Sequence, residues 1–117
     1  PVKLMSRIST PQEGQRVNVL EERWIAGIAY SGRDGISKVE VSLDDGRTWH
    51  ETNLEPPLSQ YTWTRWAFSW LREALGEFTL LVRAYDSIGN PQGTSISRAF
   101  PSGATGLHRV RVNVIAP

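Results

Sequence analysis

Apolar and polar residues alternate at every second position through most of this chain. The clearest case is the segment 107–115, where Val110, Val112 and Val114 alternate with two arginines and an asparagine. A period of two is typical of a strand that buries one face and exposes the other. The pattern predicts strands over residues 2–8, 16–30, 36–43, 49–54, 61–70, 77–86 and 107–115, the second of them long enough to bend.

Turn residues separate these segments, and helix signals are almost absent. Gly, Pro, Asn and Asp recur at roughly the 8–12-residue spacing that is typical of sandwich strands. Only residues 69–75 could form a turn of helix, which Gly76 would end. About seven short strands in one chain predict an all-β, immunoglobulin-like sandwich.

The segment between Lys38 and Trp49 predicts a hairpin with a specific turn. Asp44 can accept hydrogen bonds from the backbone of its own turn, Gly46 tolerates a positive φ angle, and Trp49 can fold over the turn as an apolar lid. The same residues fit the Asp-box pattern Ser-x-Asp-x-Gly-x-Thr-Trp of sialidase-like propellers. The pattern occurs once here and the chain is too short for a propeller, so we interpret it as a structural turn.

Aromatic side chains gather on the predicted strand 61–70. One face carries two tryptophans and a phenylalanine, which we expect in the core. The opposite face carries Tyr61, Trp63 and Arg65, a combination that can anchor a subunit interface. Two other interpretations stay open: the pair of aromatic rings stacks on a sugar, or the Pro56–Pro57 or Gly76 region folds over it.

Length and composition limit the classes of protein. The 117 residues suffice for one domain with a single core, and a formal net charge of +1 favours neither a nucleic-acid partner nor a membrane surface. The longest apolar runs are too short to span a bilayer. The absence of cysteine excludes disulfides, thiolate metal ligands and a cysteine nucleophile, and leaves the compartment open. Because the first residue is Pro1 rather than Met, we expect a processed or excised piece.

No group of residues predicts chemistry within this chain. His50 and His108 are the only histidines, they lie far apart, and no carboxylate cluster accompanies either one. Asp86 and Asn90 lie in a turn that could bind calcium, but such a turn usually binds its own backbone, and calcium takes six or more oxygen ligands. We therefore expect no metal site, no cofactor and no activity for this chain alone.

Four segments carry a family resemblance together. They are Gly27-Ile-Ala-Tyr-Ser-Gly32, the stretch from Ile36 to Trp49, Tyr61-Thr-Trp-Thr-Arg-Trp66 with residues 76–87, and His108-Arg-Val-Arg-Val112. In this order they resemble the C-terminal dimerisation domain of the sulfite oxidase family of molybdenum enzymes. The four segments cover most of the chain.

The resemblance implies an immunoglobulin-like sandwich of the E-set type that holds two enzyme subunits together as a homodimer. Residues 1–117 would form one domain, the C-terminal fragment of a larger oxidoreductase. Its partners would be a second copy and the preceding molybdopterin-binding domain, which would hold the molybdenum–molybdopterin cofactor through a cysteine that this chain lacks. The compartment is unknown, and the periplasm is a reasonable expectation for a bacterial parent.

The resemblance also implies one link to the substrate. Arg109 matches the arginine of a Trp-His-Arg-Val segment that reaches an oxyanion pocket in the family, and His108 matches its histidine, whereas Leu107 replaces the tryptophan. A guanidinium group offers a planar fork of donors that suits an oxyanion. The alternative is that Arg109 and Arg111 are solvated charges that protect an edge strand.

A second class of function competes with dimerisation. Bacterial immunoglobulin-like modules recognise carbohydrate or a surface protein, and outward aromatic rings such as Tyr61 and Trp63 would serve that purpose equally well. Loss of self-association on removing these rings would favour dimerisation, and loss of glycan retention would favour the binding module.

Overall fold

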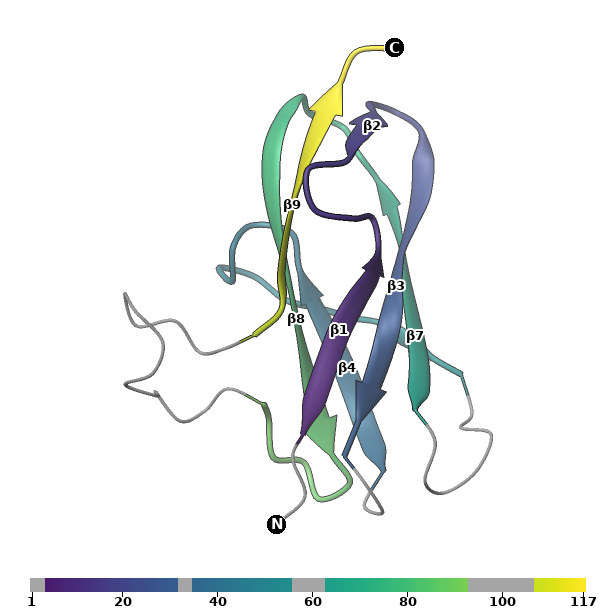
Figure 1. Ribbon diagram of the computed structural model, residues 1–117, viewed down its shortest axis with the longest axis vertical. Coiled ribbons are helices and arrows are strands. Elements are labelled where there is room, and N and C mark those ends of the chain that lie inside the picture. The colour runs from purple at the N-terminus through teal and green to yellow at the C-terminus, as the bar shows by residue number, and fades with distance from the viewer. Residues whose placement is uncertain (1–3, 32–34, 56–62, 93–106) are drawn as a thin grey trace.

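The computed structural model describes residues 4–31, 35–55, 63–92 and 107–117. In these ranges all regular elements are strands, arranged in two sheets that pack face to face (Figure 1), and no helix is long and apolar enough to cross a membrane. The strands are β1 (Met5–Thr10), β2 (Arg16–Asn18), β3 (Glu22–Tyr30), β4 (Ile36–Ser42), β5 (His50–Glu51), β6 (Asn53–Leu54), β7 (Thr64–Leu71), β8 (Gly76–Asp86) and β9 (Arg109–Ile115). The predicted all-β sandwich is confirmed.

The two sheets have different strand orders. The four-stranded sheet, named sheet A, has the order β1-β3-β7-β6, and the five-stranded sheet B has the order β2-β9-β8-β4-β5. Neighbouring strands are antiparallel except for β2, which runs parallel to β9. Strand β9 pairs with β2 only at residues 113–115, so Arg109 and Arg111 lie on the part of β9 that pairs with β8 alone. The alternative that these two arginines protect a strand edge stays a prediction.

The predicted strand 16–30 is two strands in different sheets. Strand β2 belongs to sheet B and β3 to sheet A, and the turn between them contains Leu20 at a φ of 62°. The Leu20 N–H donates to the Arg72 carbonyl at 2.7 Å. The side chain of Arg72, which is 1% exposed, donates to the carbonyls of Asn18 and Glu21. The chain changes sheets at this turn because hydrogen bonds from Arg72, directly after β7, hold it.

The segments 49–54 and 69–75 also differ from expectation. Residues 50–54 are not one hairpin strand, because β5 pairs in sheet B and β6 pairs in sheet A. Buried Thr52 lies at the crossing and donates from both its backbone N–H and its Oγ1 to the Val39 carbonyl, each at 2.9 Å. Residues 69–71 continue β7 instead of starting a helix, because Trp70 faces the core.

The core lies between the sheets and follows the predicted alternation. Its buried members are Ile8, Val17, Ile25, Ala29, Val39, Val41, Trp66, Trp70, Leu80, Val82, Ala84, Val110, Val112 and Val114. Gly27 faces this core opposite Trp66. A Cβ atom at position 27 would overlap the Arg7 carbonyl and lie 2.9 Å from Trp66 Cζ2, so this close approach requires glycine.

Candidate functional site

The outer face of sheet B pairs its own charges. Glu40 is at its centre and accepts from Arg83 Nε at 2.9 Å and from the Tyr85 hydroxyl at 2.7 Å, while Lys38 Nζ lies 3.7 Å away. The Arg83 guanidinium stacks 4.0 Å from the centroid of the Trp49 ring. Burial would raise the pKa of Glu40, but the hydrogen bonds from Tyr85 and Arg83 outweigh it, and the pKa is lowered. Glu40 therefore stays ionised within a satisfied network.

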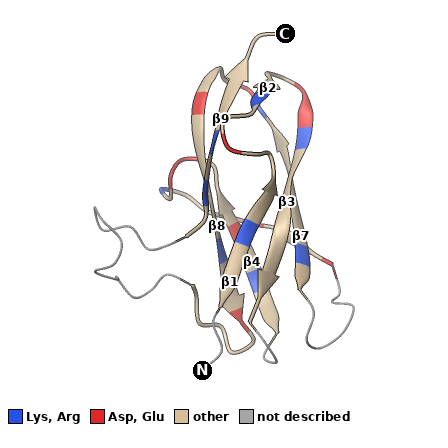
Figure 2. Ribbon diagram, in the orientation of Figure 1, with Lys and Arg blue, Asp and Glu red and all other residues tan. Residues whose placement is uncertain are grey.

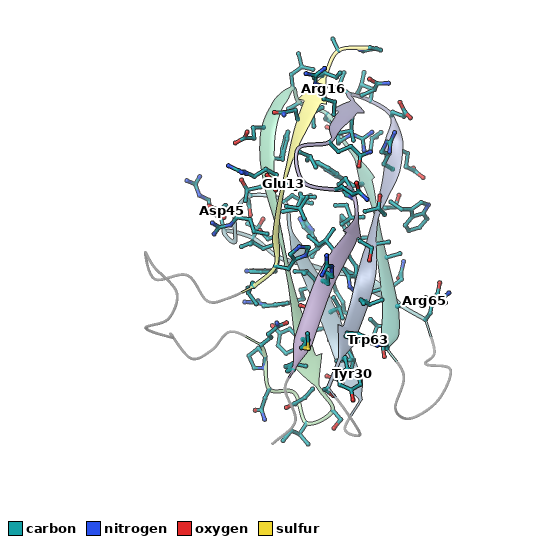
Figure 3. All side chains as sticks on the ribbon, viewed as in Figure 1. Glu13, Arg16, Tyr30, Asp45, Trp63 and Arg65 are labelled. Atoms are coloured by element: carbon teal, nitrogen blue, oxygen red, sulfur yellow. The ribbon has the colours of Figure 1, made fainter. Side chains whose placement is uncertain are left out.

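The β9 arginines have partners on neighbouring segments. Arg109 Nη2 lies 3.3 Å from Asp45 Oδ1, and Arg111 Nε donates to Glu13 Oε2 at 2.9 Å. Figure 3 shows Asp45 and Glu13 alongside this side of the sandwich. Both pairs are more than half exposed, so each contributes little to stability. They do leave the outer face of sheet B with its main charges neutralised.

The outer face of sheet A has the opposite character. It is formed by Met5 and Arg7 of β1, by Glu22, Trp24, Ala26, Ile28 and Tyr30 of β3, and by Trp63, Arg65, Ala67, Ser69 and Leu71 of and beside β7. Trp24 is 52% exposed, Leu71 49%, Trp63 43% and Met5 41%. A sheet face that exposes several large apolar side chains is a candidate interaction site. This face is the candidate functional site.

The predicted interface residues lie at one end of this face. The Trp63 ring packs 5.0 Å from that of Tyr30, and Arg65 points away from β7 beside them (Figure 3). Tyr61, the third predicted residue, lies outside the described residues. The sequence interpretation missed Trp24 and Tyr30, although the alternation of β3 with buried Ile25 was the signal that could have found them.

The Asp44 turn binds its own backbone. Asp44 Oδ2 accepts from the Thr48 hydroxyl at 2.6 Å, and Oδ1 accepts from the Thr48 N–H at 2.8 Å and from Ser42 Oγ at 2.8 Å. The Thr48 hydroxyl and N–H bonds lower the pKa of Asp44 to about 2. Gly46 has a φ of 93°, and the Trp49 ring lies close to it. Both carboxylate oxygens of Asp44 thus accept hydrogen bonds that stabilise the turn.

His108 connects the two sheets. The backbone N–H of Ile8 in β1 donates to His108 Nδ1 at 2.9 Å, just before β9 begins. Burial, and then the positive charge of Arg7, lower the pKa of His108. The imidazole is therefore a neutral acceptor, with its proton on Nε2. His108 and Arg109 are consecutive residues, but His108 bonds to Ile8 of β1 whereas Arg109 pairs with Asp45.

The turn after β8 resembles a metal-binding turn only in composition. Asp86 Oδ1 accepts from the backbone N–H groups of Ile88 at 3.1 Å and Asn90 at 2.8 Å. Within the part of the chain that the structure describes, no cluster of His, Asp and Glu side chains could hold a metal ion. The Asp86 carboxylate shapes the turn.

A family model covers nearly the whole chain. Residues 2–115 match the model described as the Mo-co oxidoreductase dimerisation domain. The chain belongs to this family. Membership favours a dimerisation and structural role for this Mo-co dimerisation domain over the module that recognises carbohydrate or a surface protein.

Curated relatives extend the comparison. The Mo-co dimerisation domain is 30% identical over 125 residues to mitochondrial sulfite oxidase of Drosophila melanogaster, covering 94% of this chain and 22% of the relative. It is 32% identical over 99 residues to sulfite oxidase of Gallus gallus, covering 80% and 21%. The chain therefore spans about a fifth of the length of the relatives it matches.

Solved structures support the fold. The sulfane dehydrogenase SoxCD from Paracoccus pantotrophus aligns with a TM-score of 0.69 at 22% identity, over 99% of this chain and 33% of that one. The fibronectin(III)-like modules of CbhA from Clostridium thermocellum align with a TM-score of 0.65 at 18% identity, over 99% and 48%. These likenesses confirm the immunoglobulin-like class of the Mo-co dimerisation domain.

Proposed function

We propose that this chain joins two copies of a larger molybdenum-cofactor oxidoreductase, and that the outer face of sheet A is the contact between them. The observation that supports this proposal is the difference between the two outer faces. The outer face of sheet B carries the paired charges of Glu40, Arg83 and Arg109, whereas sheet A, beside its own Arg65–Glu55 pair, exposes Trp24, Trp63, Met5 and Leu71. Tryptophan and arginine are enriched at the energetic centres of interfaces.

The size of the face limits the strength of the contact. The face is about 30 Å long, the length of the nine residues of β3, and about 14 Å wide, the width of the three strands β1, β3 and β7. Its area is therefore about 400 Å² per copy. A standard interface buries about 800 Å² per partner. We therefore expect the chain on its own to dimerise weakly, with a Kd of about 10 μM or higher, and further contacts to come from the rest of a longer enzyme.

Sedimentation equilibrium of this chain tests the proposal. The wild-type chain should form dimers at high micromolar concentration, and Trp24→Thr, which keeps a good strand-forming residue, should raise the Kd at least about tenfold because each dimer loses two anchors. Ile88→Thr is the control, since Ile88 is 82% exposed but lies in the turn after β8. An unchanged dimer in Trp24→Thr, or equal weakening by Ile88→Thr, would contradict the assignment of this face.

The remaining expectations concern a longer chain. A molybdenum–molybdopterin cofactor would be held outside residues 1–117, because its cysteine thiolate ligand is not available here. Arg109 would approach an oxyanion substrate only by leaving Asp45, and His108 would orient the start of β9 through Ile8. Arg109→Gln in the longer enzyme should raise KM for its oxyanion substrate while leaving the fold intact.

A further inference from the structure

The outer face of sheet A is organised in rows that cross its strands. Residues that pair across an antiparallel sheet point to the same side, so the register defines each row. The aromatic row contains Met5, Tyr30 and Trp63, the basic row Arg7, Ile28 and Arg65, the small row Thr10, Ala26, Ala67 and Asn53, the tryptophan row Trp24 and Ser69, and the acidic row Glu22 and Leu71.

These rows are asymmetric in both shape and charge along β3. The small row forms a shallow stripe between bulky rows, and the half-exposed Trp24 stands directly beside it. Acidic residues lie at the start of β3, whereas the basic positions on β1 and β7 lie further toward the other end of the sheet (Figure 2). One face thus carries a projection and a depression, and a negative and a positive end.

We infer that two copies pack these faces together about a two-fold axis that crosses β3 at right angles, level with Ile25. This inference rests on the proposed function. Such an axis reverses the strand direction, so that Trp24 faces the partner's Ala26 and Glu22 faces the partner's Ile28, which stands between the partner's Arg7 and Arg65. Each contact occurs twice, as an isologous interface requires.

Spacing supports this axis. Rows on one face of a strand are about 7 Å apart, so the tryptophan and small rows lie about 3.5 Å on either side of Ile25, and the acidic and basic rows about 10 Å on either side. On β7 the same axis places Ser69 on the partner's Ala67 and Leu71 on the partner's Arg65. Four of the five rows therefore match in pairs, within the modest angle at which sheets usually cross. The aromatic row has no partner row, because its level corresponds to residue 20, before β3 begins.

The alternative two-fold axis, parallel to the strands, fits poorly. It would place every row on its own copy, so that Glu22 faces the partner's Glu22 and the basic rows face each other. Like charges opposed across an interface are strongly unfavourable. Two Trp24 rings would also meet directly while the small rows left a gap between the copies.

Charge reversal distinguishes the two arrangements. Sedimentation equilibrium at low ionic strength should show that Glu22→Arg alone and Arg65→Glu alone each raise the dimer Kd at least about tenfold. Mixing the E22R chain with the R65E chain should give tighter association than either chain shows with itself, because one site is native and at the other the two reversed charges face each other beside an unchanged Arg7. The E77R and R16E chains are matched controls from sheet B and should dimerise as wild type does.

The other possible results of these sedimentation experiments would overturn the axis, or both the axis and the dimerisation proposal. An R65E chain that dimerises more tightly than wild type, with E22R unchanged, would establish the parallel axis and overturn ours, because that axis opposes Arg65 to the partner's Arg7 and Glu22 to the partner's Glu22. A wild-type dimer that neither reversal weakens would also overturn the axis while leaving the dimerisation proposal intact. A wild-type chain that remains monomeric up to about 1 mM would overturn both. The Arg65–Glu55 pair that R65E also removes is exposed, at 3.9 Å, and contributes little.

Discussion

Replacing Gly27 with alanine should strongly destabilise the sandwich although it adds one methyl group. The added Cβ would overlap the Arg7 carbonyl and press on Trp66, which is 1% exposed and cannot move outward. Overpacking of a rigid core costs about 1–3 kcal/mol, and one strained or lost β1–β3 hydrogen bond adds about 1 kcal/mol. The expected loss is therefore about 2–4 kcal/mol in the free energy of unfolding.

Thermal unfolding followed by circular dichroism measures this loss. An unfolding entropy of about 2.1 cal/mol/K per residue gives about 0.25 kcal/mol/K for 117 residues, so the Tm should fall by about 8–16 °C. Gly14→Ala is the control, because Gly14 has a φ of 77° and no atom within 4 Å of an added Cβ, and backbone strain alone should cost about 1 kcal/mol. The reasoning fails if Gly27→Ala lowers the Tm less than Gly14→Ala does.

Three further predictions concern polar groups that hold the fold. Arg72→Met leaves the carbonyls of Asn18 and Glu21 without their donor and should lower the free energy of unfolding, measured in urea, by at least about 3 kcal/mol. Arg72→Lys should recover less than half of this loss. A loss below about 1 kcal/mol in Arg72→Met would contradict the role of Arg72 in holding the turn. The pKa of Asp44 is lowered to about 2 from 3.8, so the stability that the Asp44 carboxylate contributes is complete above pH 4 and is lost as the pH falls through 2. Asp44→Asn should lack this part of the acid dependence. Urea midpoints of the two proteins that run parallel between pH 2 and 5 would refute this prediction. Burial and the charge of Arg7 lower the pKa of His108, while Glu13 opposes them, so the stability that His108 contributes is present above pH 6.5 and declines as the pH falls below that value. ¹⁵N NMR at pH 7 should find the imidazole proton on Nε2. A protonated Nδ1 would exclude the hydrogen bond from the Ile8 N–H.

Where one face of a strand meets the core, alternation was enough to predict the structure. Val110, Val112 and Val114 are all buried, as are Leu80, Val82 and Ala84, because each of these strands has a single apolar face. The all-β class followed from these patterns together with the turn residues between them. Phe68 shares the inward face of β7 but is only half-buried, since it contacts the exposed His50 near the crossing strand.

Features that depend on distant contacts were not predictable from local pattern. The division of residues 16–30 depends on Arg72, more than fifty positions away, and the change of sheet at Thr52 depends on the Val39 carbonyl. The candidate interface was found only in part for the same reason. Trp63 and Arg65 stand out within one strand, but Trp24 and Ala26 gain their meaning from cross-strand register, which a single sequence does not reveal.

The strand that passes from one sheet to the other at Thr52 has a mechanical consequence. In a simple sandwich, the two sheets are held by interdigitated apolar side chains, and the hydrophobic effect that drives this packing is non-directional. Here β5 and β6 are continuous in the chain, and Thr52 fixes their junction to the Val39 carbonyl through two directional bonds. Sliding would have to break both bonds at once. A torque applied to sheet A is thereby carried into sheet B, so that whatever is attached to either sheet turns with the domain as one stiff body.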